Sequence, residues 1–404
     1  MVQIINKHIL QSFFKMKVDL MNETIPLFLP DITNEDKKAI LETLNKALLT
    51  DGPKLREFES SFAKFTGAKY AIGVSNATSA LHLSLLANNV GKGDEVIIPD
   101  MTFVATANAV IHSGATPVFV DVEMNSMNIS VDSIKEKINK KTKAILPVHF
   151  AGKVCNIKQI VKIVKENNLK LIEDCAHAIG ARVGKNHVGT FGNSGCFSFY
   201  PTKNITTIEG GMVITDSKEI AEKISLLRNH GLTKTLSQRY SKGMPWDYDV
   251  IQSGYNYRLD EIRSTLGISQ LKRIRKLNQN RKKIYEYYNK KFKNVEEIIT
   301  FPSSEKEEHV YHLYMIRINK KSKVSRDKLF SKLLKLGIKT TVHYKPLHKF
   351  SAFKKFIKSN NKFNNSNQLY NEILSLPFYP NMPKNHQECV ITSILKILEK
   401  GNKK

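Results

Sequence analysis

The sequence of 404 residues lacks any long apolar run and has only one tryptophan and four cysteines. A membrane span needs about 18 consecutive apolar residues, so no span and no membrane partner are predicted. The short apolar stretch from Ile9 to Phe14 has no small-residue cleavage site, so it does not resemble a secretory signal. The cysteines have no metal-ligand or redox spacing, which predicts no metal site and a reducing, cytoplasmic location: Cys155, Cys175, Cys196 and Cys389.

Acidic residues are also scarce, since 37 Asp+Glu face 63 Lys+Arg and leave a net charge of +26. Residues 271–404 hold 31 of these basic residues and 10 of the acidic ones, a net charge of +21. Such a region is compatible with nucleic acid, an anionic surface or a polyanionic small substrate. The excess is scattered lysine without the interleaved aromatics of single-strand binders, so a solvated surface is the simpler interpretation. The best nucleic-acid candidate is the helix carrying Lys272-Arg273-Arg275-Lys276 and Arg281-Lys282-Lys283.

Short apolar strands alternate with helices through the first two thirds of the chain. This alternation predicts an α/β fold with a largely parallel sheet covered by helices on both faces. Ligands of such sheets gather at the carboxyl ends of the strands. Strands are expected at Tyr70–Val74, Glu95–Pro99, Pro117–Asp121, Ala144–Val148 and Leu169–Ile172, and helices at Ala77–Ala87, Phe103–His112 and Ile157–Glu166.

The chain divides into three parts at the sequence level. Residues 1–24 form an extension, residues 25–265 a large domain, and residues 266–404 a linking helix with a smaller α+β domain. The helix is expected at Leu259–Lys293, and a loop at the Asn-rich segment Ser359–Gln368. Thr33 is expected to cap an early helix, and Gly67 to end the next one.

Small and hydroxyl residues join the first strand to the following helix. Within Ser75–Leu81, backbone N–H groups and hydroxyls at the helix N-terminus fit a phosphate, which the helix dipole favours. Helix capping without a ligand remains the alternative for this segment.

Two charged residues follow later strands. Asp174 ends an apolar strand, where a carboxylate is costly unless paired. A protonated pyridine nitrogen is one such partner, and a structural salt bridge or a helix cap is the other interpretation. Lys203 leaves an apolar, aromatic strand, a setting that lowers the pKa of an amine and favours nucleophilic chemistry. Most lysines of this chain are expected at the surface, so the argument for Lys203 depends on its spacing from Asp174.

These segments, in this order, resemble the DegT–StrS family of sugar aminotransferases. The resemblance runs from about Ile25 to the last helix. It implies the type I fold of aspartate aminotransferase, with a mostly parallel seven-stranded sheet, and pyridoxal phosphate as cofactor. Its motifs are Gly52-Pro53 with Phe58-Glu59, Ala77-Thr78-Ser79, Thr102–Asn108, Glu173–His177, Ser198–Met212, Asn229–Gly231, Gly254–Asp260, His343–Leu347 and Leu376-Pro377.

The resemblance assigns three catalytic residues and a stacking ring. Lys203 is implied to bond the cofactor covalently and to shuttle the proton. Asp174 is implied to pair with the pyridine nitrogen, and His177 to contact the ring oxygen O3′. Phe103 is implied to stack on the ring.

The cofactor phosphate is assigned to the turn before the helix. The resemblance implies Ala77, Thr78 and Ser198 as its ligands, with Ser79 in the same turn. Asn256 is implied to reach the phosphate of the neighbouring subunit, which predicts a homodimer with shared sites.

Substrate contacts are assigned to His343 and Tyr344. Because Lys203 is present where dehydratases of the family have histidine, amino transfer from glutamate is favoured. Ala77-Thr78, His177 and an insert at Thr233–Asp249 resemble the branch that aminates C4 of nucleotide-linked 4-keto-6-deoxy sugars. A 3-keto-sugar aminotransferase, a dehydratase of the same fold and, more distantly, a nucleic-acid-binding regulator remain alternatives.

Overall fold

The structure is a computed structural model that describes residues 24–46, 48–234, 238–239, 244–301, 309–357 and 361–402. The predicted extension, residues 1–24, lies outside this part of the chain except for Thr24. The predicted insert from Thr233 to Asp249 is described only in part. Among the described residues, no helix is both long and apolar enough to cross a membrane.

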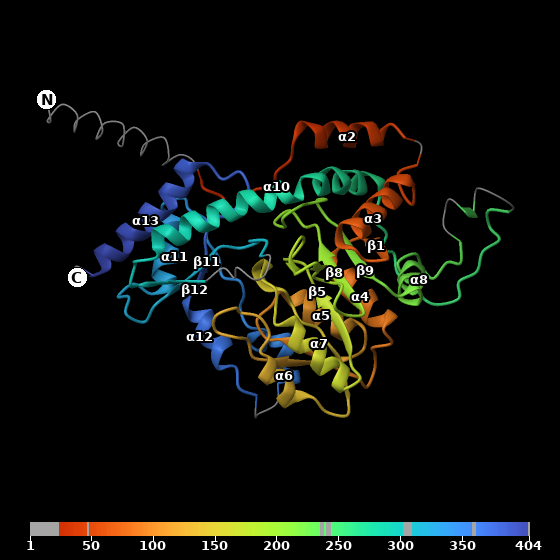
Figure 1. Ribbon diagram of the computed structural model, residues 1–404, viewed down its shortest axis with the longest axis horizontal. Coiled ribbons are helices and arrows are strands. Elements are labelled where there is room, and N and C mark those ends of the chain that lie inside the picture. The colour runs from red at the N-terminus through yellow and green to blue at the C-terminus, as the bar shows by residue number, and fades with distance from the viewer. Residues whose placement is uncertain are drawn as a thin grey trace.

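A seven-stranded sheet forms the centre of the molecule (Figure 1). Its spatial order is β1 (Tyr70–Val74), β9 (Gly211–Thr215), β8 (Ser194–Ser198), β5 (Lys170–Asp174), β4 (Thr142–Ile145), β2 (Glu95–Pro99) and β3 (Thr116–Val120). β9 runs antiparallel to both of its neighbours, and the other neighbouring pairs are parallel. The expected mostly parallel sheet is therefore confirmed.

Helices cover both faces of this sheet because its strands are apolar on both faces. Along β2, Ile97 joins one buried cluster, while Val96 and Ile98 join the other. The first cluster packs under α3 (Pro53–Thr66), α6 (Val131–Lys137), α7 (Ile157–Glu166) and the start of α10 (Glu261–Phe292). The second packs under α4 (Ala77–Ala87), α5 (Val104–His112) and α8 (Lys218–Leu227).

The long helix α10 leads from the central sheet to a second, antiparallel sheet (Figure 1). That sheet has the order β10 (Ile298–Thr300), β11 (Met315–Ile318) and β12 (Ile373–Ser375), and it packs with α11 (Arg326–Lys335) and α13 (Lys384–Asn402). The expected smaller α+β region is thus present. The predicted boundary between residues 265 and 266 falls inside α10 and remains a prediction.

The remaining elements are short or lie at the edges. They are α2 (Asn34–Leu44), α12 (Asn364–Glu372), the hairpin β6 (Arg182–Val183) with β7 (Asn186–His187), and 3₁₀ turns at Phe150–Gly152, Leu347–Lys349 and Ser351–Phe356. The predicted Thr33 cap is confirmed, since its hydroxyl accepts a hydrogen bond from the Asp36 N–H at 3.3 Å. Gly67 ends α3 in the left-handed conformation, as expected.

The expectation of a loop at Ser359–Gln368 is wrong from Asn364 onward, where α12 begins. The carboxylate of Asp121 accepts hydrogen bonds from the N–H groups of Asn365 and Ser366 and from the Ser366 hydroxyl. Leu369 then buries its side chain against the protein core. A distant carboxylate therefore caps a helix whose own sequence favours a loop.

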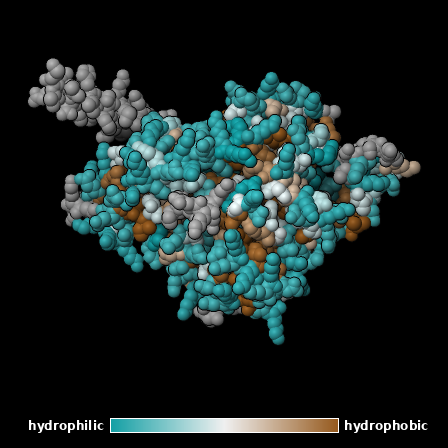
Figure 2. Space-filling model, in the orientation of Figure 1, coloured by the Kyte–Doolittle hydropathy of each residue, from teal (hydrophilic) through white to brown (hydrophobic). Residues whose placement is uncertain are grey.

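Three cations of the basic run on α10 are used within the fold. Arg273 forms an ion pair with Asp36 at 2.7 Å, and Lys282 pairs with Glu286 at 3.8 Å. Arg281 is buried and donates hydrogen bonds to backbone carbonyl oxygens. These three cations are used within the protein, whereas Lys272 and Arg275 of the same run are exposed and have no ion pair among the described residues. The face of the molecule in Figure 2 is mostly hydrophilic, as the lysine-rich composition predicts.

Candidate active site

Asp174 lies at the carboxyl end of β5, where its side chain is buried with 4% of the residue exposed. The Thr106 hydroxyl donates to one carboxylate oxygen at 3.0 Å, and the Ala176 N–H donates to the other at 3.1 Å. Burial nevertheless raises the pKa of Asp174 above its ordinary value. A buried carboxylate held by two neutral donors fits a cationic partner such as a protonated pyridine nitrogen.

Lys203 faces the same site from the loop after β8. Burial lowers the pKa of the Lys203 amine from 10.5 to about 8, while the charge of Asp174 opposes that shift. The interaction is mutual, since the charge of Lys203 also lowers the pKa of Asp174. The two predicted residues therefore share one site, and the Lys203 amine loses its proton at a lower pH than an ordinary lysine does.

His177 and Tyr344 meet at this site although 167 positions separate them in the chain. The Ala151 N–H donates to Nδ1 of His177 at 3.3 Å, and Nε2 lies 3.2 Å from the Tyr344 hydroxyl. Burial lowers the pKa of His177 well below its ordinary value, so the ring is neutral. With Nδ1 accepting, Nε2 carries the hydrogen and donates to Tyr344, whose own O–H is left free for a ligand.

Phe103 and His343 complete this part of the site. The Phe103 ring lies 5.8 Å from that of Tyr344, between centroids, and the residue is 55% exposed. Nδ1 of His343 lies 2.8 Å from the Ser375 hydroxyl. Burial lowers the pKa of His343 to about 4, and the charge of Lys203 contributes to this shift. The predicted substrate residues thus lie beside the predicted catalytic ones.

The predicted phosphate turn forms the N-terminus of α4. Asn76 caps this helix by accepting a hydrogen bond from the Ser79 N–H at 2.8 Å. Gly211 lies so close that an added Cβ would stand 2.9 Å from the Ala77 nitrogen. Because Gly211 is paired with Ser198 across β8 and β9, Ser198 also lies near this helix end. The arrangement offers backbone donors and a hydroxyl, which suits a phosphate group.

Asn256 occupies a different position, in the loop before α10. Its backbone pairs with that of Asn229, and the residue is exposed. Its predicted reach to a neighbouring subunit remains a prediction.

Sequence reasoning missed His312, which enters the site from the segment before β11. Its ring centroid lies 4.4 Å from that of His177, and its Nδ1 lies 3.1 Å from Oδ1 of Asn204, the neighbour of Lys203. Burial lowers the pKa of His312 well below its ordinary value, so Nδ1 donates as a neutral ring. Its place is set by a tertiary hydrogen bond from its N–H to the Ala151 carbonyl at 2.9 Å, which no local pattern signals.

Replacing His312 with phenylalanine should lower kcat about tenfold with little change in KM, by analogy with other residues that orient a site through a second side chain. The phenyl ring keeps the contact with His177 but cannot donate to Asn204. Steady-state kinetics and thermal unfolding should be measured together. Equal kcat with a lower Tm would show that His312 only supports the fold.

A buried cluster beneath the site contains His149, Glu173 and Cys175, whose ligand atoms lie within 4.8 Å of one another. The Glu173 carboxylate already accepts hydrogen bonds from three backbone N–H groups at 2.8–2.9 Å and contacts His149 at 3.0 Å. Its acceptor sites are therefore filled by the protein, which favours a structural role.

The fold and this site fit a pyridoxal-phosphate-dependent enzyme, and comparison with known proteins makes it a sugar aminotransferase. It belongs to the DegT/DnrJ/EryC1/StrS aminotransferase family, whose model matches residues 30–395. The protein is 37% identical to the spore coat polysaccharide biosynthesis protein SpsC of Bacillus subtilis, over 95% of this chain and 99% of that one.

Solved structures support the same assignment. PseC of Helicobacter pylori, an aminotransferase involved in the biosynthesis of pseudoaminic acid, is 34% identical with a TM-score of 0.87, covering 94% of this chain and all of that one. The PLP-form of Spr1654 from Streptococcus pneumoniae is 29% identical with a TM-score of 0.87, over the same shares. The resemblance seen in the sequence is thereby confirmed, as are the cofactor and the type I fold.

Proposed function

We propose that the enzyme transfers the amino group of glutamate to C4 of a nucleotide-linked 4-keto-6-deoxy sugar in the cytoplasm. The observation that carries the proposal is that the buried amine of Lys203 and the buried carboxylate of Asp174 act on each other's charge within one site, where burial lowers the pKa of the amine to about 8. The likeness to PseC, which is involved in the biosynthesis of pseudoaminic acid, and to SpsC, a spore coat polysaccharide biosynthesis protein, supports a sugar substrate in polysaccharide or amino-sugar biosynthesis.

The amine of Lys203 would hold the cofactor through its aldehyde and, once free, would move the proton of the donor Cα. Asp174 keeps the ring nitrogen protonated by holding a negative charge beside it. When bound, pyridoxal phosphate supplies the conjugated ring that stabilises the carbanion. Since one lysine serves both halves of the reaction, donor and acceptor should follow ping-pong kinetics.

The remaining residues position the two ligands. The Ala77-Thr78 turn at the N-terminus of α4 and the Ser198 hydroxyl hold the phosphate. Tyr344 offers its free O–H to the substrate, since its oxygen already accepts from His177. Burial lowers the pKa of His177 and that of His343, so both rings are neutral and act as hydrogen-bonding groups beside Lys203.

We also propose a homodimer in which Asn256 contacts the phosphate of the partner's site. Tyr200 and Ile208 expose 47% and 58% of their surface in a single chain, and a partner subunit would cover these apolar groups. The exposure of Asn256 itself is compatible with that role.

Mixing Lys203→Ala with Asn256→Ala subunits tests the shared site. Each variant alone should be nearly inactive, and mixed dimers should regain activity, because one of their two sites has neither defect. Half of randomly mixed dimers are hybrids, so recovery should approach about one quarter of wild-type activity per total subunit. No recovery after verified subunit exchange would show that Asn256 acts within its own chain.

A substrate panel tests the function itself. Purified enzyme with glutamate is offered nucleotide-linked 4-keto-6-deoxy and 3-keto sugars, and 2-oxoglutarate is measured. We expect 2-oxoglutarate and a 4-amino sugar in equal amounts from the first group. Amination of only the 3-keto sugars would replace the proposed substrate. Loss of a sugar hydroxyl without glutamate consumption would instead identify a dehydratase.

A further inference from the structure

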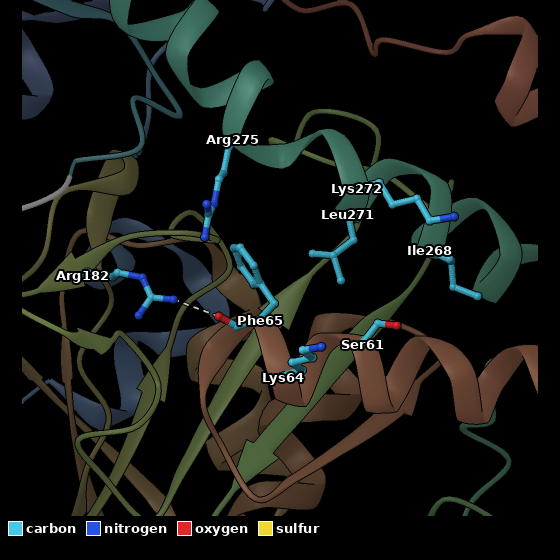
Figure 3. A pocket seen from close by; sticks show the side chains of 8 residues that line it. All are labelled: Ser61, Lys64, Phe65, Arg182, Ile268, Leu271, Lys272 and Arg275. Carbon is cyan, nitrogen blue, oxygen red and sulfur yellow. Dashed lines mark hydrogen bonds between the residues drawn. The ribbon is translucent and has the colours of Figure 1, made fainter.

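A hollow of about 400 Å³ lies between α3 and α10, and none of its lining residues belongs to the candidate active site (Figure 3). Four cations line it, namely Lys64, Arg182, Lys272 and Arg275, and no acidic residue does. Its volume falls within the range of small-ligand pockets in proteins, roughly 300–1,000 Å³. The hollow is therefore large enough for a small molecule, and its lining carries only positive charge.

Three of these cations lack a counter-ion in the part of the chain that the structure describes. The exposed side chains of Lys64, Lys272 and Arg275 make no ion pair or hydrogen bond there, whereas Arg273, also on α10, pairs with Asp36. Like charges that surround one hollow repel one another, and an anion between them removes that repulsion. Lys272 and Arg275 thus lie on the side of α10 that faces α3, and Arg273, whose charge is neutralised, lies on the side that faces α2.

Arg182, the fourth cation, is fixed in place. Its guanidinium donates to the carbonyl oxygens of Phe65 and Lys185, each at 2.8 Å. Two of its five N–H groups are thereby used, and the others are left for a ligand. Figure 3 shows Arg182 and Arg275 with Phe65 at one end of the hollow, and Lys272 with Ser61 toward the other. A guanidinium held in this way loses little freedom when it binds phosphate.

The floor between the cations is apolar. Leu271 points from α10 toward α3, and the Phe65 ring lies between the two helices (Figure 3). A simple inorganic anion would gain nothing from this floor. A ligand of matching chemistry carries several negative charges and a flat body that stacks on an aromatic ring.

We propose that this hollow is a second binding site, separate from the active site, that takes a nucleoside polyphosphate. The phosphates lie against Lys64, Arg182, Lys272 and Arg275, and the base lies on Phe65. The site requires neither the cofactor nor the proposed sugar substrate, so its test stands apart from that of the aminotransferase reaction.

Photolabelling of the cofactor-loaded protein with 8-azido-ATP, followed by peptide mapping, tests the position of the site. We expect saturable labelling of peptides that contain Phe65 or Leu271. Unlabelled ATP should compete with the probe more strongly than inorganic triphosphate does, since the latter lacks a base to stack on Phe65. Labelling confined to peptides with Lys203 or Tyr344 would overturn the proposal, because the probe would then occupy only the active site.

Charge reversal supplies the matched control. Lys272→Glu with Arg275→Glu should weaken ATP binding in calorimetry at least about tenfold, since phosphate contacts depend on these cations. Lys276→Glu, a change of the same kind at an exposed residue of α10 outside the hollow, should change it less than about twofold. All variants should keep the wild-type Tm and cofactor absorbance. Equal weakening of ATP binding by Lys276→Glu would overturn the proposal, as would tighter binding of an oligonucleotide than of ATP. Either result would mean that anions are attracted to the basic surface in general.

Discussion

Lys203→Ala should lower kcat for amino transfer by at least about 10³-fold, since a positioned general acid–base group contributes about 10²–10⁴ and the covalent link is lost as well. The protein should still bind the cofactor through the turn at the start of α4. The measurement is 2-oxoglutarate release from glutamate, with cofactor content determined by absorbance. Lys185→Ala, at an exposed lysine in the β6–β7 turn, is the control and should retain full activity.

Borohydride reduction supplies an independent readout of the same residue. It should fix the cofactor onto the peptide that contains Lys203. The absorbance band of the lysine-bonded cofactor, near the edge of the visible range, should be absent from Lys203→Ala. In the cofactor-free protein, the lowered pKa places the free amine above a pH of about 8 and the charged amine below it. Reaction with added pyridoxal phosphate should therefore rise with a midpoint near that pH. A midpoint near 10.5, the value of an ordinary lysine, would contradict the proposed environment.

Asp174→Asn is expected to reduce kcat by about 10²–10³, the loss found when a preorganised electrostatic contact to the reacting group is removed. The amide keeps the shape and one acceptor oxygen for the Thr106 hydroxyl, but it cannot hold the ring nitrogen in its protonated form. The assay is the same as for Lys203, with cofactor absorbance recorded to confirm that the ring is still bound.

The folding stability of the Asp174→Asn variant should not fall with its activity. The pKa of Asp174 is raised in the folded protein, so ionisation is penalised there, and stability from this group is lost as pH rises through the raised pKa. At pH 7 the cofactor-free Asp174→Asn protein should have a Tm close to that of wild type, because removal of the buried charge offsets the lost acceptor for the Ala176 N–H. Asp121→Asn, which weakens the cap of α12, should lower Tm while sparing turnover. A large Tm loss in cofactor-free Asp174→Asn would make Asp174 a structural salt-bridge residue instead.

Local patterns predicted most of the central sheet and its helices. Ala77–Ala87 and Ile157–Glu166 were expected with the bounds that α4 and α7 have, because apolar spacing and flanking turn residues define them. The antiparallel direction of β9 had no such signal, since orientation within a sheet depends on pairing between distant segments. α12 was missed for a related reason, as its cap is the distant Asp121.

The site was predictable where its residues follow strands. Asp174 and Lys203 each leave an apolar strand of the sheet, so topology brings them together. His312 follows no such rule, because it precedes β11 and reaches His177 only through the pairing of its segment with Ala151. Contacts between two sheets connected by α10 cannot be inferred from spacing along one chain.

In the chain, α10 separates the residues proposed for the reaction from those proposed to bind the sugar. Lys203 and Asp174, proposed to carry the reaction, precede this helix in the sequence. His343 and Tyr344, proposed to contact the sugar, follow it. Preference for a new acceptor could therefore evolve by exchange around positions 343 and 344 while the reactive half stays intact. Grafting that later segment between relatives would transfer selectivity without rebuilding the chemistry.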